Sequence, residues 1–403
     1  MAKRLNGEGS YWFDEAKQLH RAAITTPAGA RLTKSSKDAE IVKDWLNEQR
    51  LAIGRGQHVE PSVLTLTDWL YQFVETYSRP PKVKQRTYER YRSLIPHVDP
   101  IGQNNLQKIT PAHLQGLYNT LYEEGFSGST RRQVHQLLHA ALKRAVINRL
   151  LNHNTADLVD PPKADSKEVE TFTAKEIDLL LKVARTWRQY PAFLLAVTSG
   201  MRLGEILGVR WCDIDMDAHV VHVRQNLQVS ALKGIMLDSP KTEKGKRKIK
   251  LPAITINTLA EYRKVWAESR LKHPGDDDLI FVTKNHKPAS PQNFLNRFWW
   301  RIQIDAEFMM NRTKVNPMSE HKKLEVLLEE HRAKDDWQQF PAKNFHAIRH
   351  TWATTLLAAG VPIVDVSRAL GHAKVSTTLN IYGHAIPENS NMIAEKIAVA
   401  FLK

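Results

Sequence analysis

Four short clusters in the second half of the chain concentrate side chains that could do chemistry. They read TSGMRLGEILGVRW, SPKTEKGKRKIKLP, FHAIRHTWATTLLAAG and LGHAKVSTTLNIYGH. Guanidinium groups can bind an anion through two oxygens, imidazoles can move protons near neutral pH, and a tyrosine can act as a nucleophile. Each cluster alone is a weak signal, because 17 histidines and many arginines make about one His-x-x-Arg expected by chance. Their order and mutual spacing carry the information.

The composition favours an anionic partner. Lysine and arginine number 58 against 43 acidic residues, which gives a net charge of +15. Such an excess attracts nucleic acid first and anionic membranes second, although a generally basic, solvated surface explains it as well. Hydrophobic residues make up 42%, and the longest apolar runs are far short of a membrane span. We therefore expect a soluble, cytoplasmic protein of two or three domains.

Two other kinds of site are disfavoured. The single cysteine, Cys212, allows neither an internal disulfide nor a structural zinc site, and we expect it to be buried. His346 and His350 are four apart and could suggest a metal site. However, HAIRH lacks the glutamate of the zinc-protease motif, and no third ligand is evident. We expect no metal and no other cofactor, and a structural role for His350.

The elements that must position these clusters begin with a small sheet. Residues 8–34 contain three short strand-like runs separated by turn signals. Ser36 then caps a helical pattern that should end near Gly54. We expect residues 1–58 to form a three-stranded sheet plus a helix.

The next segment, residues 59–160, reads as an all-α bundle of four or five helices. Thr110 before Pro111 is a helix N-cap, and Thr130 with Gln133 resembles a capping box. The stretch VDPPKADSKEVE, with two prolines and mixed charge, predicts a linker over residues 161–167.

Residues 168–403 read as a mainly helical α+β domain. Thr173 with Glu176 forms a capping box, PAFLLAVTSG predicts a buried helix ending at Gly200, and Ser290 starts another helix. The alternating runs AHVVHVRQ and RKIKLPAI predict a strand, a basic loop and a second strand. A polar stretch over residues 305–340 contains EHKKLEVLLEEHRAK, which alone would form a charged amphipathic helix.

In order and spacing the clusters resemble the tyrosine recombinase family, the phage integrases. Members carry an arginine before a helix with glutamate three residues on, a hairpin lysine, a His-x-x-Arg, a Gly-His, and a tyrosine nine or ten residues later. The specific matches are TSGMRLGEI and LGH....TT..IY followed by GH, while the beginning of the chain more loosely resembles the sheet domain that integrases use on arm-type DNA sites. The matching residues are Arg202 with Glu205, Lys241, His346 with Arg349, Gly371 with His372, and Tyr382.

The resemblance implies a site-specific DNA recombinase of integrase type. Its fold would comprise an arm-type DNA-binding domain over residues 1–58, a helical core-binding, SAM-like domain over 59–160, and a catalytic domain of the DNA breaking-rejoining type over 168–403. Strands would be cleaved and rejoined through a covalent 3′-phosphotyrosine, with neither ATP nor metal. The implied partners are double-stranded DNA with core-type and arm-type sites, a homo-tetramer on that DNA, and a DNA-bending protein or directionality factor.

The chemistry of a phosphodiester agrees with this resemblance. Negative charge spreads over its non-bridging oxygens during transfer, so the forks of Arg202 and Arg349 suit them, and His346 and His372 can donate hydrogen bonds or move protons. A phenol with a reference pKa near ~10 is mostly protonated at pH 7, so Tyr382 needs cations or a base in order to attack. The choice of Lys241 to protonate the leaving oxygen, among the lysines of its loop, rests on the family's lysine position.

Basic residues outside the catalytic set fit contacts to DNA phosphates. The stretch PPKVKQRTYERYR, residues 80–92, places lysines and arginines over Tyr88 and Tyr91, although a solvated helix face fits equally well. The DNA-binding candidates are Lys82, Lys84, Arg86 and Arg90, with Lys244, Lys246 and Arg247 in the basic loop.

Other interpretations stay open. Arg202 and Glu205 alone could be an ordinary i,i+3 pair, and Tyr382 alone a half-buried helical tyrosine. The chain could also be a DNA-binding regulator that does not cleave, or a type IB-like topoisomerase. The intact polar set argues against the first and the separate arm-type domain against the second. Residues 305–340 could bind a partner or be a passive excursion, and the segment after Tyr382 could dock in cis or in trans.

Overall fold

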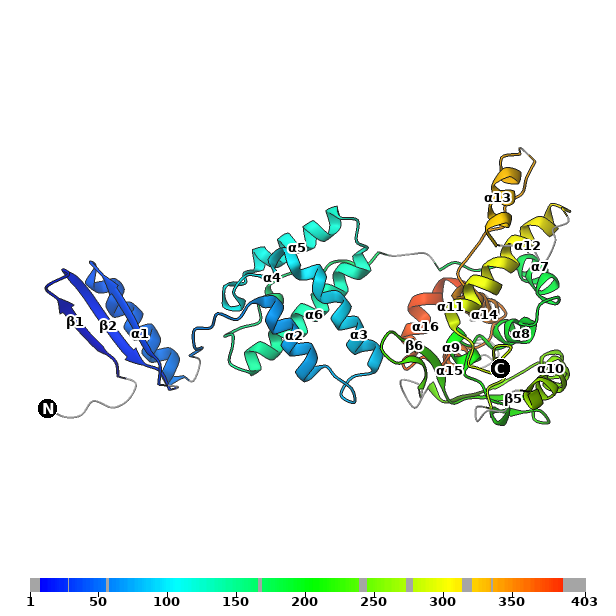
Figure 1. The fold of residues 1–403 in the computed structure, drawn as a ribbon, viewed down its shortest axis with the longest axis horizontal. Coiled ribbons are helices and arrows are strands. Elements are labelled where there is room, and N and C mark those ends of the chain that lie inside the picture. Colours follow the sequence, from blue (N-terminus) through cyan, green and yellow to red (C-terminus); the bar gives the residue numbers. More distant parts are fainter. Residues whose placement is uncertain are drawn as a thin grey trace, which may run out of the picture. The chain divides into compact units, whose positions relative to one another are not determined.

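The structure, a computed structural model, describes residues 8–27, 29–55, 58–165, 169–238, 245–272, 278–313, 321–334 and 336–386. The chain divides into two compact units, Met1–Lys167 and Glu168–Lys403. The first holds a small sheet with a helix and then a helical bundle, and the second is mainly helical with short strands (Figure 1). Within these ranges no helix is long and apolar enough to cross a membrane.

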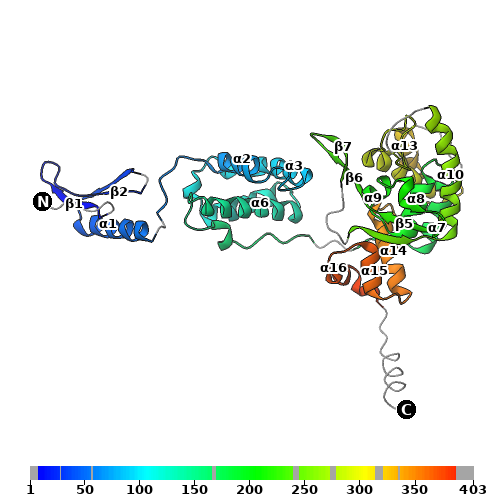
Figure 2. The ribbon, with the colours of Figure 1, turned by 90° about the horizontal axis from the view of Figure 1, so that it is seen from below.

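The first unit begins with an antiparallel three-stranded sheet in the order β1-β2-β3, whose strands are Ser10–Asp14, Leu19–Thr25 and Arg31–Ser36. Helix α1, Ala39–Gly54, lies along the sheet (Figure 2) and buries Val42 and Leu46 against Ala22 and Ile24. The helix ends where the sequence predicts. Its predicted cap is wrong, because Ser36 ends β3 and Asp38 accepts the bond from the amide of Glu40.

The bundle that follows contains only helices and helical turns among its described elements. The cap at Thr110 is confirmed, with Pro111 in the first turn of its helix. The capping box at Thr130 is wrong, because Ser127 is the N-cap and its hydroxyl accepts from the amide of Thr130. The helices are α2 Leu66–Tyr77, α3 Gln85–Leu94, α4 Asp99–Gly102, α5 Pro111–Glu123 and α6 Gly128–Ile147.

In the second unit, helices drawn from residues 174–382 pack around a hydrophobic core. Its described helices are α7 Ala174–Ala184, α8 Tyr190–Ser199, α9 Leu203–Leu207, α10 Ala253–Lys272, α11 Pro291–Phe294, α12 Trp300–Met310, α13 His321–Arg332, α14 His346–Ala358, α15 Ile363–Leu370 and α16 Val375–Tyr382, with a π-helical turn at Leu295–Trp299. The predicted capping box at Thr173 and cap at Ser290 are confirmed.

Two small sheets are found among the described residues of the second unit. Strands β4 Ile214–Asp215, β5 Val220–Val223 and β8 Arg247–Lys250 pair antiparallel in that order, as the two alternating runs predict for β5 and β8. Between β5 and β8 the sequence predicts a loop, but β6 Asn226–Ser230 and β7 Gly234–Asp238 form a hairpin there. Together these elements confirm the predicted fold class: a sheet with a helix, an all-α bundle, and a mainly helical α+β unit.

The described residues of the polar stretch 305–340, which precedes α14, pack against α12. Helix α13 is the predicted amphipathic helix, and its Arg332 donates two hydrogen bonds of 2.7 Å to Glu307 of α12. Glu307 is 1% exposed and also accepts from the indole of Trp337 and the amide of Phe340.

The expectation that Cys212 is buried is wrong, because its side chain is exposed.

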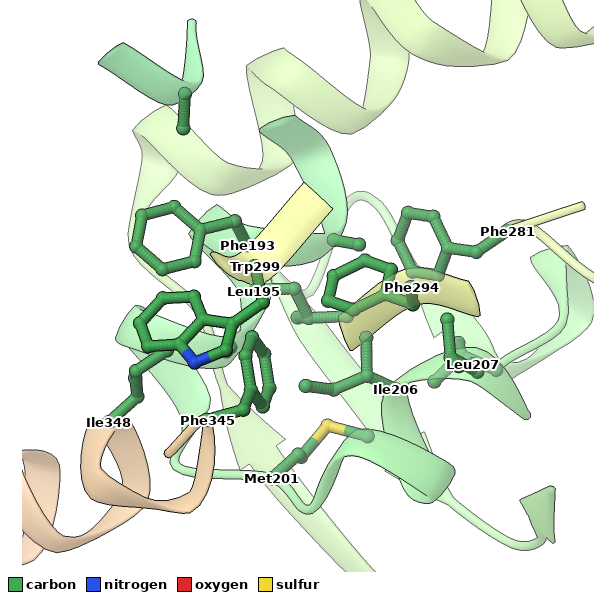
Figure 3. Close-up of a cluster of buried hydrophobic side chains, with 14 of the residues drawn as sticks. Phe193, Leu195, Met201, Ile206, Leu207, Phe281, Phe294, Trp299, Phe345 and Ile348 are labelled. Carbon is green, nitrogen blue, oxygen red and sulfur yellow. The ribbon is translucent and has the colours of Figure 1, made fainter. Parts of the chain in front are cut away.

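An aromatic and aliphatic core (Figure 3) holds the segments that carry three of the four clusters, whereas Leu370 and Tyr382 of the fourth pack in a separate cluster with Leu357. Trp299 and Phe193 lie at its centre and are completely buried. The core also takes in the apolar neighbours of the candidate residues: Met201 precedes Arg202, Phe345 precedes His346, and Ile348 precedes Arg349. The indole of Trp299 donates to the carbonyl of Lys343 at 2.9 Å, just ahead of α14. Packing therefore fixes the backbone on which the polar side chains stand.

Candidate active site

Arg202 stands in the sharp turn between α8 and α9. Gly200 ends α8 in the left-handed conformation, at φ +62°, and a Cβ there would meet the ring of Trp352 at 2.7 Å. The backbone of Arg202 is then extended, so it caps α9 and its side chain keeps 42% of its surface exposed. Its guanidinium donates to Glu205 Oε1 at 3.0 Å. The pair seen in the sequence therefore exists, and it leaves the arginine open on one side.

Glu205 is a buried anion enclosed by arginine. Its Oε2 accepts from the amide of Arg202 at 2.9 Å, and Arg247 donates to both of its oxygens at 3.1 and 2.8 Å. Burial alone would raise the pKa of Glu205, but the bonds and charges of Arg247 and Arg202 outweigh it and hold the pKa at about 2. Arg247 also donates to the carbonyl of Ala369 at 2.5 Å. The buried pair thus joins α9 and β8 to the end of α15.

Replacing Glu205 with glutamine is expected to lower the free energy of unfolding of the second unit by roughly 3–5 kcal/mol, because it leaves the buried Arg247 without its counter-charge. A carboxylate whose folded pKa is depressed stabilises the fold above its ordinary value of 4.5, and this contribution is lost as the pH falls towards about 2. The wild type should therefore lose stability across that window more steeply than Glu205→Gln. Urea unfolding followed by tryptophan fluorescence at several pH values measures both effects.

A matched control is the exposed pair on α15. Asp365 and Arg368 are also spaced i,i+3 and lie 2.8 Å apart, but their side chains are 55% and 74% exposed. Asp365→Asn should change stability by less than about 1 kcal/mol. Equal effects of the two substitutions would show that the buried pair has no special structural role.

Arg349, in the third of the four sequence clusters, is 2% exposed. Its guanidinium donates to the carbonyls of Gly200 and Leu370 at 2.8 and 2.7 Å, and it lies 3.2 Å from His372 Nε2. Burial, followed by the nearby charge of Arg202, lowers the pKa of Arg349 to about 9. The group is still cationic at neutral pH, and the mutual repulsion of the two arginines favours an anion between them.

His372 is held beside Arg349 by the turn after α15. Gly371 ends that helix with φ +70°, a conformation that suits glycine. His372 Nδ1 then lies 2.8 Å from the hydroxyl of Thr378 on α16. Burial and the charge of Arg349 lower the pKa of His372 to about 4. The imidazole is therefore neutral at pH 7 and has its Nε2 directed at the guanidinium.

His346 opens α14 and is exposed. Its ring makes an edge contact with that of His350, with centroids 4.7 Å apart. Partial desolvation, His350 and Arg349 lower the pKa of His346. It faces solvent on the side of α14 that also carries His350, one turn further on.

Tyr382 ends α16 and is 1% exposed. Its ring packs with Ala353, Leu357, Val366 and Leu370, and its hydroxyl lies 2.7 Å from His350 Nδ1. Burial raises the pKa of Tyr382, while the charges of Arg349 and Arg202 act in the opposite direction. The phenol therefore lies within electrostatic reach of both arginines, although the tyrosine is more deeply buried than its sequence suggests.

The remaining predicted site residues divide into three groups. Lys241 and Lys244 lie outside the described residues. Lys246 is exposed, as are Lys82, Arg86 and Arg90, and Lys84 is half-buried at the N-cap of α3. Arg247 is revised in part: its guanidinium is buried and bonded to Glu205 and to backbone carbonyls, so it supports the site, while the residue also lines the basic pocket beside His372.

A basic pocket of about 720 Å³ lies next to His372. Lys246 and Lys248 line it from the β8 side, and Arg368 and Lys374 line it from α15 and the turn before α16. The pocket has no acidic lining residue among those described, so it suits a phosphate oxygen.

In the basic stretch of residues 80–92, Tyr88 is 4% exposed, and its hydroxyl donates to Glu75.

Sequence reasoning missed three members of the site. In the sequence Thr378 appears only within the motif LGH....TT..IY, Arg247 is a candidate DNA contact, and His350 is expected to be structural. The sequence signal for His350 is its i,i+4 spacing from His346, which places the two rings in contact on α14. In the described part of the chain no group of three or more His, Cys, Asp or Glu side chains is arranged to hold a metal ion.

Comparison with known proteins yields matches along the whole chain. Residues 170–389, more than half of the chain, match the Phage integrase family, and residues 65–122 match its N-terminal SAM-like domain. A tyrosine recombinase XerC-like protein of Caldanaerobacter subterraneus subsp. tengcongensis is 29% identical and is covered completely, as is this chain. The transposase of transposon Tn916 from Enterococcus faecalis is 23% identical over 90% of this chain and 83% of its own length.

Solved structures show the same fold. The integrase of transposon Tn1549 in complex with a circular intermediate DNA is 19% identical and covers 83% of this chain and 99% of its own, with a TM-score of 0.64. Lambda integrase, as a tetramer bound to a Holliday junction, is 16% identical and covers 96% of this chain and 99% of its own, with a TM-score of 0.54. At these identities the likeness concerns the fold.

Proposed function

Because this chain belongs to the phage integrase family, it is a site-specific DNA recombinase, and we propose that the arginine, histidine and tyrosine cluster described above is its catalytic site. Strand breakage and rejoining would proceed by attack of Tyr382 on a DNA phosphodiester. Arg202 and Arg349 would bind the non-bridging oxygens, and His346 would donate a hydrogen bond to the same phosphate. His372, whose Nε2 faces Arg349 and whose Nδ1 contacts Thr378, would hold that guanidinium in place.

The observation that carries this proposal is the convergence on Arg349. Residues from four separate segments meet there: the turn before α9, α14, the turn after α15, and α16. The carbonyls of Gly200 and Leu370 hold the guanidinium, His372 lies beside it, and its charge acts on the phenol of Tyr382. Cationic donors around a nucleophile are what an anionic, charge-spreading transition state requires.

The proposed chemistry needs neither ATP nor a metal ion. A phosphotyrosine retains the energy of the DNA bond that was broken, so the free 5′ hydroxyl of another strand can reverse the step. The family position assigns Lys241 to protonate the leaving 5′ oxygen. The two arginines would supply the charge that a metal ion supplies in other phosphoryl-transfer sites.

The basic surfaces would carry the rest of the DNA. The pocket beside His372, with Lys246, Lys248, Arg368 and Lys374, supports contacts to phosphates next to the cleaved one. On the helical bundle, the exposed Lys82, Arg86 and Arg90, with Lys84, support contacts to the core-type site. Such contacts give affinity with little sequence choice.

The domain roles extend this assignment. We place an arm-type DNA-binding domain at residues 1–58, a core-binding domain at 59–160, a linker at 161–167 and the catalytic domain at 168–403. Recombination of two duplexes requires four active sites, so a homo-tetramer on DNA is expected, the state in which lambda integrase is described on a Holliday junction. We place the reaction in the cytoplasm, with a DNA-bending protein or directionality factor as a further partner.

The test is a nicked suicide duplex built from the DNA that flanks the gene. The wild-type protein is expected to form a covalent adduct that survives denaturation, with equal yield in the presence of EDTA and without ATP. A non-cleaving regulator would bind the duplex and give no adduct. A topoisomerase would relax supercoiled plasmid without exchanging strands between two flanking sites. Absence of the adduct at DNA concentrations that saturate binding would sink the proposed chemistry.

A further inference from the structure

His350 is the polar partner that the structure records for the hydroxyl of Tyr382. Its Nδ1 lies 2.7 Å from that oxygen, and the two ring centroids are 5.5 Å apart. This distance is within the range of about 2.6–3.2 Å in which a side chain can take a proton directly. His350 lies on α14 directly after Arg349, and Tyr382 ends α16, so the contact is formed by tertiary packing.

The phenol needs such a partner because solvent cannot reach it. Tyr382 is 1% exposed and its ring is surrounded by the aliphatic cluster of α14 and α15. Burial raises the pKa of Tyr382, so the phenol is protonated at neutral pH. When the oxygen attacks phosphorus, its proton must therefore pass to a neighbouring group of the protein.

His350 suits this role by its charge state as well as its place. It is half-buried, and desolvation followed by the charge of Arg349 lowers the pKa of His350, which leaves the ring neutral at pH 7. The ionisable groups around it are His346 and Arg349 on α14 and Tyr382 on α16, and Arg202 acts on both His346 and Tyr382. His346, in contrast, faces solvent and contacts the ring of His350.

We propose that His350 is the general base of the reaction, accepting the phenolic proton of Tyr382 at Nδ1. This inference rests on the proposed function. As the bond from Tyr382 Oη to phosphorus forms, the bond from phosphorus to the 5′ oxygen breaks. The phenolic proton moves to His350 Nδ1, and the departing 5′ oxygen takes a proton from the general acid. In rejoining, His350 returns its proton to the phenol, while the attacking 5′ hydroxyl gives its proton back to the acid.

The discriminating variant is His350→Asn. Its amide oxygen can occupy the place of Nδ1 and accept a hydrogen bond, but it cannot take up a proton at neutral pH. Single-turnover adduct formation on the nicked suicide duplex should fall by about 10²- to 10⁴-fold at pH 7. The rate of the variant should then rise about tenfold per pH unit up to pH 9, because only tyrosine that is already ionised reacts. The wild-type rate should change far less over the same range.

A chemical rescue separates a base from a structural support. Replacing Tyr382 of His350→Asn with a fluorinated tyrosine, whose phenol ionises at lower pH, should restore most of the lost rate at pH 7. A role in packing would not respond to the acidity of the phenol. His350→Asn should also remain slow on a duplex with a bridging 5′ phosphorothiolate. The sulfur of that substrate departs without a proton from the general acid, but the phenolic proton of Tyr382 must still be removed.

The matched control is His331→Asn on α13, an imidazole that contacts the carbonyl of Leu327 away from the site, and it should react at the wild-type rate. DNA binding and thermal unfolding verify that each variant is folded. A rate for His350→Asn within about tenfold of wild type, or a slow variant that the fluorinated tyrosine does not rescue, would overturn the role of His350 alone. A wild-type protein that forms no adduct would overturn this role together with the proposed function.

Discussion

Tyr382→Phe will bind the suicide duplex normally and form no covalent adduct, with a loss of at least about 10⁴-fold. Removing a covalent nucleophile has effects of this size because no other group can start the reaction. The substitution keeps the ring that packs against Leu357 and Leu370 and deletes the oxygen that contacts His350. Denaturing gel electrophoresis measures the adduct, and a mobility shift on the same duplex measures binding.

The control for this prediction is Tyr262→Phe. Tyr262 is another largely enclosed tyrosine of the second unit, packed against Phe281 and Trp211, and burial also raises its pKa. The control should cleave like the wild type, which would show that loss of a phenol in the core does not by itself abolish activity. An adduct that persists in Tyr382→Phe would move the nucleophile to another residue.

Arg202→Ala will reduce cleavage by about 10²- to 10³-fold, the effect of removing one preorganised donor from a charge-spreading transition state. Binding of the duplex should stay within about tenfold, because phosphate contacts are distributed over a large basic surface. The fold should survive the substitution, since Glu205 keeps both hydrogen bonds from Arg247 and the amide bond at position 202. The readout is the single-turnover rate of adduct formation at saturating protein.

Arg210→Ala is the matched control for Arg202→Ala. Arg210 also pairs with an acid three residues on, Asp213, and its side chain is 35% exposed, close to the 42% of Arg202. Asp213 retains Arg224 when Arg210 is removed. The control should cleave at nearly the wild-type rate. If Arg202→Ala instead lost duplex binding wholesale, its role would be to position DNA rather than to stabilise the transition state.

The elements that the sequence predicted well are those with local signals. The caps at Thr110, Thr173 and Ser290 are confirmed, because a side-chain oxygen that bonds an amide three residues on needs no partner elsewhere in the chain. Thr130 carries the same pattern but lies in the first turn of α6, because Ser127 is available three residues earlier and takes the cap. The capping pattern therefore predicts the wrong residue where two neighbouring residues can both act as the N-cap.

The hairpin of β6 and β7 and the exposure of Cys212 were not predicted, for a different reason. The run that forms the hairpin lies between two stronger alternating strands and carries a basic, polar loop that suggested no pairing. Cys212 lies beside the buried Trp211, and on a short helical turn adjacent residues face different directions. Both depend on which face of a segment meets the core.

The sequence by itself determined the family, the order of the polar residues and the kind of reaction, because the order and spacing of the motifs can be read directly from the linear sequence. Only the tertiary structure decided which neighbour each of these groups has. Arg247, a candidate DNA contact in the sequence, is the buried counter-ion of Glu205, and His350, expected to be structural, contacts the hydroxyl of Tyr382. Residues far apart in the chain acquire their charge state from burial and from partners, and both are set by how α9, α14 and α16 pack.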